Sequence, residues 1–265
     1  MAVIRSNYYS MARTGIVDFT AILPIDADVN PEDGYHKGPF KTIYLLHGYQ
    51  GNQDDWITRT RIEMFAKTLG FAVIMPAGLN RFYVDCEPLN EYYGKFIGEE
   101  LVTVTRQMFP LSKKREDTFI GGLSMGGYGA IRNGLKYNKV FSAIIALSSA
   151  LITDEIAQAT PETPMNVGTY DYYCTTFGNL KKLPGSDKDP KALAKKALKA
   201  NAPRMYLSCG TEDFLYEKNV DYHQHLEKIG YAHTYVEKPG SHTWTYWDSE
   251  MLEALKWLKK SGTGD

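Results

Sequence analysis

A glycine-flanked serine between an apolar run and a helix-like run constrains this chain more than any other feature. The segment reads Phe119-Ile-Gly-Gly-Leu-Ser-Met-Gly-Gly-Tyr128, so that Gly122, Ser124 and Gly126 form a Gly-x-Ser-x-Gly pentapeptide. A strand, a sharp turn with an exposed serine and a helix in this order form a nucleophile elbow. Glycines two positions either side of the serine let strand and helix approach closely. Taken alone, the pentapeptide also fits an ordinary surface turn.

Alternating strand-like and helix-like runs surround this segment and predict the fold class. Strands are expected over 2–9, 15–23, 41–46, 71–76, 116–122 and 141–147, and helices over 56–68, 92–108 and from Met125 onward. The pattern predicts an antiparallel opening that leads into βαβ units, in an α/β-hydrolase fold with a mostly parallel central sheet flanked by helices. Because 265 residues with 43% hydrophobic content can bury one large core, we expect a single domain over residues 1–265.

Two further residues complete an acyl-transfer site in the order serine, aspartate, histidine that is typical of α/β-hydrolases. Asp213 follows a short apolar run that begins at Pro203, and His242 follows a second strand-like run and a Pro-Gly turn. Both residues should lie on loops at the carboxyl edge of the sheet, where ligands bind in such folds. We predict Ser124 as nucleophile, His242 as base and Asp213 as the group that orients the base, with Glu212 as the alternative carboxylate.

The loop after the strand at 41–46 is expected to stabilise the oxyanion. It contains Leu45-Leu-His-Gly-Tyr-Gln-Gly51, and the backbone N–H groups of Tyr49 and Met125 are the expected donors. His47 is expected to order this loop by hydrogen bonding rather than to act as a base. Trp244 and Trp247 follow His242 and either pack in the core or line the substrate pocket.

The alternating pattern stops after Ser149, and residues 150–202 are expected to form a small, cap-like insertion over the catalytic edge. The segment holds four prolines and clustered lysines, and Asp189 with Pro190 should begin a helix within it. Since charge and proline interrupt its apolar residues, it differs from the apolar lid of a lipase. This favours small soluble esters over emulsified fats.

Composition excludes several other classes of function. A formal net charge of -1 gives no broad attraction for nucleic acid or for an anionic membrane.

The first residues lack the apolar core of a signal peptide, and no run is long enough to span a bilayer, so a cytoplasmic protein is expected. Three scattered cysteines form no disulfide framework and no metal motif; Cys209 should be a buried apolar residue, whereas Cys86 or Cys174 could place a thiol near the substrate.

The combined motifs resemble those of the bacterial esterase D-like family, which includes tributyrin esterases and cinnamoyl or feruloyl esterases. They are Leu45-Leu-His-Gly48, Phe119 to Gly129, Cys209-Gly-Thr-Glu-Asp213 and Gly240-Ser-His242, together with the opening Met1-Ala-Val-Ile. The resemblance covers essentially the whole chain. It implies an α/β-hydrolase fold, a serine esterase without metal or cofactor, the triad Ser124, Asp213 and His242, short-acyl or hydroxycinnamoyl esters as substrates, and often a homo-oligomer.

Three functional hypotheses follow from these observations. The first is a carboxylesterase that acts through an acyl-enzyme on small soluble esters. The second is a thioesterase that hydrolyses S-formylglutathione, because fold and triad do not determine the substrate. The third is a binding protein that has lost its chemistry, which the presence of all three triad residues disfavours. The residues of the 150–202 insertion that line the pocket are not identifiable from the sequence.

Overall fold

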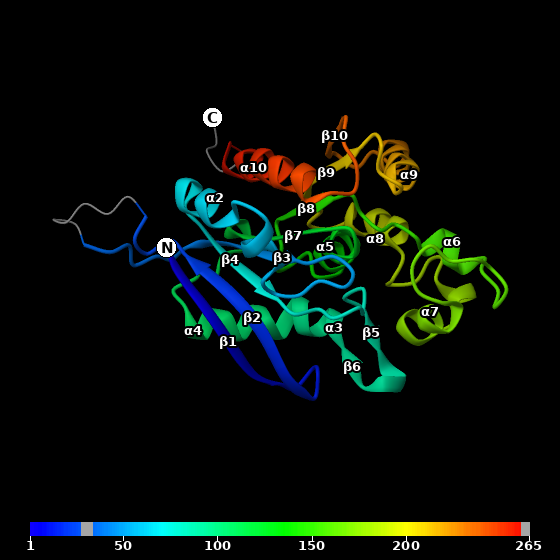
Figure 1. Ribbon diagram of the computed structural model, residues 1–265, viewed down its shortest axis with the longest axis horizontal. Coiled ribbons are helices and arrows are strands. Elements are labelled where there is room, and N and C mark those ends of the chain that lie inside the picture. The colour runs from blue at the N-terminus through cyan, green and yellow to red at the C-terminus, as the bar shows by residue number, and fades with distance from the viewer. Residues whose placement is uncertain (28–33, 261–265) are drawn as a thin grey trace.

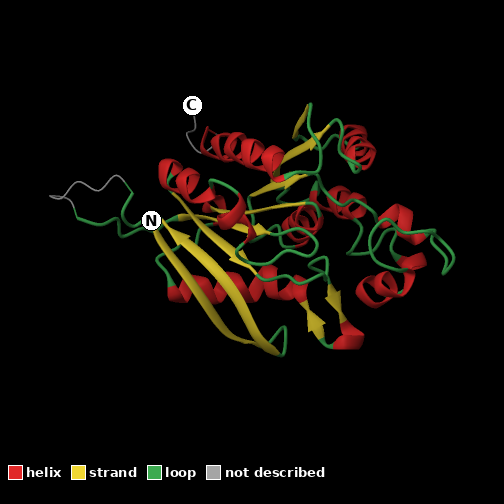
Figure 2. Ribbon diagram, in the orientation of Figure 1, coloured by secondary structure: helices red, strands yellow, loops and turns green. Residues whose placement is uncertain are grey.

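The computed structural model describes residues 1–27 and 34–260, and within them eight strands form one sheet with helices on both faces (Figure 1 and Figure 2). The strand order is β1-β2-β4-β3-β7-β8-β9-β10. These strands are β1 (Ala2–Ser10), β2 (Gly15–Leu23), β3 (Lys41–Leu46), β4 (Phe71–Pro76), β7 (Thr118–Leu123), β8 (Ala143–Leu147), β9 (Arg204–Gly210) and β10 (Thr234–Lys238). Pairing is antiparallel for β1 with β2 and for β2 with β4, and parallel for every later neighbour. The predicted α/β-hydrolase class is therefore confirmed.

Helices cover the two faces of the sheet in two groups. The helices are α1 (Asp55–Arg59), α2 (Ile62–Leu69), α3 (Tyr93–Lys95), α4 (Leu101–Met108), α5 (Met125–Lys136), α6 (Thr153–Ala157), α7 (Tyr170–Phe177), α8 (Pro190–Ala197), α9 (Tyr216–Lys228) and α10 (Trp244–Lys260). Apolar residues of α1, α2 and α10 share one core cluster, and those of α4, α5, α8 and α9 share the other. Figure 2 shows α10 and α2 on the opposite side of the sheet from α4.

The central strand β3 shows why both faces carry helices. Its residues alternate between the two clusters, with Ile43 and Leu45 in one and Tyr44 and Leu46 in the other, and all four are fully buried. Successive side chains of a strand point to opposite faces, so an unbroken apolar run requires cover on both. The sheet edge at the carboxyl ends of the strands is thus left for loops.

Of two helices expected in the first half of the chain, one is interrupted and the other is observed nearly as predicted. The helix predicted over 56–68 is interrupted at Thr60, whose extended backbone ends α1 and whose hydroxyl accepts the N–H of Ile62 at the start of α2. The helix predicted over 92–108 is observed as continuous helical structure from Tyr93 to Met108. It directly follows a small hairpin of β5 (Asp85–Cys86) and β6 (Glu91–Tyr92), which lie on either side of the 3-10 turn η1 (Glu87–Leu89). The π-helical turn η2 (Phe96–Glu100) then leads from α3 into α4. The short 3-10 turn η3 (Arg115–Asp117) precedes β7.

The chain between β8 and β9, hereafter the 150–202 segment, contains α6, α7, the 3-10 turn η4 (Leu180–Lys182) and α8. The start of α8 follows the prediction, since the Asp189 carboxylate accepts the N–H of Lys191 and Pro190 occupies the first turn. The sequence between β2 and β3 is polar over residues 26–38, where a loop is expected, and positions 28–33 of it lie outside the described residues.

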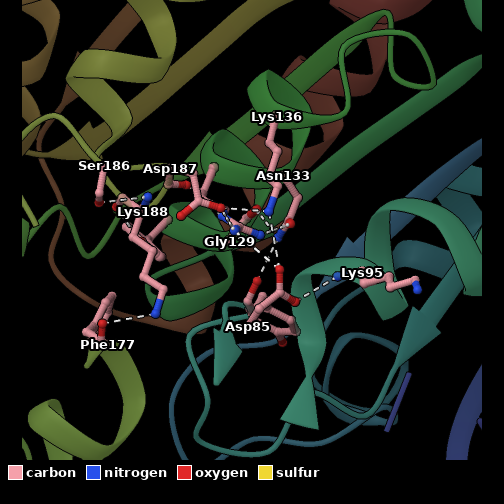
Figure 3. Close-up of polar contacts among 12 residues, drawn as sticks. Asp85, Lys95, Gly129, Asn133, Lys136, Phe177, Ser186, Asp187 and Lys188 are labelled. Carbon is pink, nitrogen blue, oxygen red and sulfur yellow. Dashed lines mark hydrogen bonds and ion pairs between the residues drawn. The ribbon is translucent and has the colours of Figure 1, made fainter. Parts of the chain in front are cut away.

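A buried arginine on α5 anchors the 150–202 segment to the main sheet. The Arg132 side chain is fully buried and donates to the Asp187 backbone oxygen at 3.0 Å and to its carboxylate at 2.7 Å. Lys136, one turn further along α5, also binds the Asp187 carboxylate, and Asp85 completes the group (Figure 3). The same helix that begins at the nucleophile elbow therefore holds this segment in place.

Candidate active site

Ser124 occupies the sharp turn between β7 and α5. Its backbone has φ 54° and ψ -119°, a conformation that non-glycine residues rarely adopt and that is typical of strained active-site positions. Three hydrogen bonds hold the turn: Ser124 N–H donates to Leu147 O, and Ser124 O accepts from Tyr128 N–H and Ala150 N–H. The hydroxyl is thereby fixed at the carboxyl edge of the sheet.

The two glycines of the pentapeptide are required by close backbone packing. A Cβ at Gly122 would clash with Gly126 O, and a Cβ at Gly126 would clash with the carbonyl oxygens of Leu46 and His47. Backbone atoms at these positions cannot rotate away as a side chain can. The strand–turn–helix geometry predicted from the sequence is thus sterically specific.

Three residues from separate loops meet beside this turn. His242 Nε2 lies 3.0 Å from Ser124 Oγ, and His242 Nδ1 lies 3.0 and 2.9 Å from the two carboxylate oxygens of Asp213. Since the carboxylate only accepts, Nδ1 carries the proton and Nε2 is left to accept from the serine hydroxyl. The sequence-predicted serine, histidine and aspartate are therefore brought into one hydrogen-bonded chain.

The Asp213 side chain is buried, yet its surroundings favour the ionised carboxylate. Burial opposes ionisation of this carboxyl, but hydrogen bonds from His242, from Leu215 N–H and from Ser148 outweigh it and hold its pKa below the ordinary value. Leu215 N–H lies 2.9 Å from Asp213 Oδ1. The alternative carboxylate, Glu212, instead accepts from Gly240 N–H and Thr211. Asp213, and not Glu212, is thus the carboxylate that accepts a hydrogen bond from His242.

A mostly apolar cavity with a volume of about 60 Å³ opens at Ser124. Tyr49 and Met125 both line it. Met125 is the first residue of α5, so its N–H has no intrahelical acceptor, and the positive end of the helix dipole faces the site. The remaining lining residues are Phe82, Ala150, Ile152, Glu155, Ile156, Met165, Asn166, Val167, Tyr173, Phe214, Leu215 and Lys218.

His47 orders the loop that carries Tyr49. Its Nε2 accepts Gly78 N–H at 2.8 Å, so the proton is on Nδ1, which lies 2.7 Å from Gly48 O. Burial lowers the pKa of His47 and favours the neutral ring. Both ring nitrogens are used by the backbone, in agreement with the structural role expected from the sequence.

The two tryptophans pack with the core cluster of α10 and do not line the cavity. Trp247 packs its ring perpendicular to His242, with centroids 4.8 Å apart, and its Nε1–H donates to Ser148 Oγ at 3.0 Å. Trp244 packs edge-on against Trp56 and Trp247. Neither is among the residues that line the cavity at Ser124.

Two neighbours of the triad were not anticipated. Ser148 links the Trp247 indole to Asp213, and Phe214 lies against the His242 ring with centroids 4.6 Å apart while 60% exposed. Ser148 directly follows β8, the neighbour of β7, so the rule that placed Asp213 at the carboxyl edge would also have placed Ser148 there. Phe214 could have been identified as a neighbour of the site because it directly follows Asp213 in the sequence.

The cysteines contribute no thiol to the cavity lining. Cys86 donates to Thr175 O, and neither it nor Cys174 lines the cavity. Burial raises the pKa of the Cys209 thiol to about 12, with a further contribution from the Asp213 charge. Among residues 1–27 and 34–260, no cluster of three or more histidine, cysteine or acidic side chains could hold a metal ion. None of the helices within those ranges is both long and apolar enough to cross a bilayer.

Comparison with known proteins decides the family. The family model described as "Putative esterase" matches residues 25–258. The chain is 44% identical to an acetyl esterase of Caldicellulosiruptor saccharolyticus over 266 residues, which covers 98% of this chain and 99% of that protein. The chain belongs to this esterase family. It is a serine carboxylesterase of the esterase D-like group of α/β-hydrolases, as the motifs predicted.

Two solved structures from Staphylococcus aureus support the same assignment. The fluorophosphonate-binding serine hydrolase FphF superposes with a TM-score of 0.85 at 32% identity. The S-formylglutathione hydrolase FrmB superposes with a TM-score of 0.82, also at 32% identity. Each comparison covers 97% of this esterase and 98% of the other chain. The similarity therefore extends through the 150–202 segment as well as the sheet.

Proposed function

We propose that Ser124, His242 and Asp213 form the catalytic triad of this esterase and that the N–H groups of Tyr49 and Met125 bind the oxyanion. The observation that carries the proposal is the continuous chain from Ser124 Oγ through His242 to Asp213, with distances of 2.9 to 3.0 Å at each step. Both proposed donors line the cavity into which Ser124 opens. This arrangement satisfies the geometric roles of nucleophile, base and orienting acid.

The reaction follows from this geometry in two halves. Ser124 Oγ attacks the acyl carbon while His242 Nε2 takes its proton, and the negative charge that develops on the carbonyl oxygen is stabilised by the two N–H groups. His242 then returns the proton to the leaving alcohol, which leaves an acyl-enzyme on Ser124. Water, deprotonated by His242, attacks the acyl-enzyme and releases the carboxylic acid. Asp213 stabilises the imidazolium in both halves.

We further propose that the physiological acyl group is short, with acetyl favoured. One water molecule needs about 10 to 15 Å³ of cavity volume. The cavity of about 60 Å³ at Ser124 therefore accepts an acyl chain of a few atoms. The bulkier hydroxycinnamoyl group, with its complete aromatic ring, is the alternative acyl group that the experiment below compares. The acetyl esterase activity named for the 44% identical relative agrees with the same acyl size.

The test is kcat/KM on p-nitrophenyl acetate, butyrate and octanoate and on methyl ferulate, with Ser124→Ala as control. We expect acetate or butyrate to be preferred and turnover to be lost in the variant. A preference for methyl ferulate would overturn the short-acyl proposal. Turnover that survives in both Ser124→Ala and His242→Ala would overturn the triad.

A thioesterase is the second candidate, since FrmB is named as an S-formylglutathione hydrolase and a formyl group is even smaller than acetyl. Comparison of S-formylglutathione with p-nitrophenyl acetate at equal enzyme concentration separates the two functions. A kcat/KM on the thioester that exceeds the oxygen ester by orders of magnitude would favour the thioesterase.

The organisation and context of the chain complete the proposal. We propose one α/β-hydrolase domain over residues 1–265 in which 150–202 is a cap-like insertion. A cytoplasmic location, assembly into a homo-oligomer, and no affinity for nucleic acid or membrane stay predictions from the sequence. Light scattering after gel filtration measures the assembly state.

A further inference from the structure

An ion pair joins the two walls of the cavity near its opening. Lys218 Nζ, on α9, lies 2.8 Å from Glu155 Oε2, on α6, and both residues line the cavity that contains Ser124. Their side chains are 31% and 44% exposed, so the pair lies where the cavity meets solvent. It connects the 150–202 segment directly to the helix that follows the Asp213 loop.

The helix that carries Glu155 is itself a wall of the cavity. Ile152 and Ile156, one turn apart, are buried and line the cavity from this side. The helix α6 has only five residues and no side-chain hydrogen bond at its N-terminus. Such a short helix depends on tertiary contacts for its position.

The aromatic side of the cavity adjoins the same carboxylate. Burial raises the pKa of Tyr173 to about 12, and the Glu155 charge contributes next. The Glu155 carboxylate that pairs with Lys218 is therefore also close enough to Tyr173 to act on its hydroxyl. A second connection runs through α8, where Lys191 binds Asp154 of α6 and Asp221 of α9, each at 2.6 Å. Of these two connections, the Glu155–Lys218 pair is the one whose residues line the cavity.

We propose that the Glu155–Lys218 ion pair determines acyl-chain specificity by holding α6 against α9 and closing the outer end of the acyl pocket. The proposal rests on the function proposed above, in which Ser124 is acylated within this cavity. With the pair intact, Ile152 and Ile156 limit the pocket to a short chain. Without it, α6 can move outward and a longer chain can extend through the opening toward solvent.

The experiment compares kcat/KM for p-nitrophenyl octanoate with that for p-nitrophenyl acetate in Glu155→Gln and Lys218→Met. Partly exposed ion pairs are weak, so we expect the octanoate-to-acetate ratio to rise by about two- to fivefold. Glu253→Gln is the matched control, because it removes an ion pair of similar exposure, Lys256 to Glu253 at 2.9 Å, on α10 outside the cavity. Its ratio should equal that of the parent enzyme.

A charge exchange separates the ion pair from a change in side-chain size. Glu155→Lys places two ammonium groups together and should raise the ratio most, and the double variant Glu155→Lys/Lys218→Glu should return it toward the parent value. An unchanged octanoate-to-acetate ratio in both Glu155→Gln and Lys218→Met would overturn the role of the pair. A double variant whose ratio stays as high as that of Glu155→Lys would overturn it as well.

Failure of the underlying function is recognised separately. If Ser124→Ala retained the acetate turnover of the parent enzyme, acylation at Ser124 would be refuted and this inference with it. If Ser124→Ala is inactive while the ratios do not respond, the triad stands and only the specificity role is wrong.

Discussion

Replacement of Asp213 by asparagine should disable His242 by selecting the wrong tautomer. The Asp213 Oδ1 atom accepts Leu215 N–H at 2.9 Å, a contact that only the oxygen of an asparagine can keep. The asparagine NH₂ group then occupies the Oδ2 position, 2.9 Å from His242 Nδ1. Two donors cannot face each other, and the oxygen that remains, 3.0 Å from Nδ1, already accepts Leu215 N–H. We therefore expect Nδ1 to lose its proton and Nε2 to become protonated. Nε2 then donates to Ser124 Oγ and cannot accept its proton.

The size of the effect follows from the loss of the base. In serine proteases the same change lowers kcat by about 10⁴, which at about 1.36 kcal/mol per tenfold is about 5 kcal/mol of transition-state stabilisation. Since the Asp213 side chain is fully buried, no solvent molecule can replace the missing acceptor. We therefore expect a decrease in kcat of a similar order with little change in KM.

The assay is steady-state hydrolysis of p-nitrophenyl acetate by Asp213→Asn, with circular dichroism to show that the variant is folded. Glu212→Gln is the control, because Glu212 accepts from Gly240 N–H and a glutamine oxygen can do the same. It should keep most of its turnover. An Asp213→Asn enzyme with at least a tenth of the parent kcat, or a Glu212→Gln enzyme that is the more impaired of the two, would refute the reasoning.

Three further predictions concern the turn, the buried carboxylate and the anchor of the 150–202 segment. Gly126→Ala should destabilise the protein by about 1 to 3 kcal/mol in urea unfolding, because the new Cβ meets Leu46 O, whereas Gly15→Ala, whose Cβ has its nearest neighbour at 3.9 Å, should not. The pKa of Asp213 is lower in the folded protein than in the unfolded chain, where it is near 4, so the ionised carboxylate stabilises the fold above that pH. This stabilisation is lost as the pH falls toward the lower pKa of the folded state. The difference in free energy of unfolding between the parent and Asp213→Asn should therefore shrink from pH 7 to pH 3, and a constant difference would contradict this. Asp187→Ala removes a charge-assisted hydrogen bond from the fully buried Arg132 and should cost about 1.5 to 3 kcal/mol in urea unfolding, an effect that an unchanged midpoint would disprove.

The nucleophile elbow could be predicted from the sequence because its constraints are local. Gly122 and Gly126 are needed by atoms within the same strand–turn–helix unit or the adjacent strand, so the pattern of residues reports the geometry directly. Asp213 and His242 could be placed for a related reason. Parallel strands end at one edge of a sheet, so residues that follow different strands converge without knowledge of side-chain packing.

The tryptophans show where this reasoning stops. Their proximity to His242 in sequence suggested either core packing or a wall of the pocket, and the choice depends on which face of the sheet α10 covers. Trp247 belongs to the core cluster of α10, whereas Ile152, Ile156 and Tyr173 of the cavity belong to the other cluster. The sheet lies between the two sets, which is a property of the assembled fold and has no local signature.

The determinants of specificity are harder still to read because they combine long-range and weakly patterned contacts. Glu155 and Lys218 are two of 31 acidic and 30 basic residues, and no periodicity relates them across the 63 positions that separate them. A single exposed ion pair adds little stability, so neither propensity nor hydrophobic pattern requires it. Its effect arises from position, since it closes a cavity of about 60 Å³ in which a shift of one short helix changes the acyl length that fits. In this esterase the chemistry can therefore be predicted from local sequence, while the choice of substrate depends on how the 150–202 segment packs.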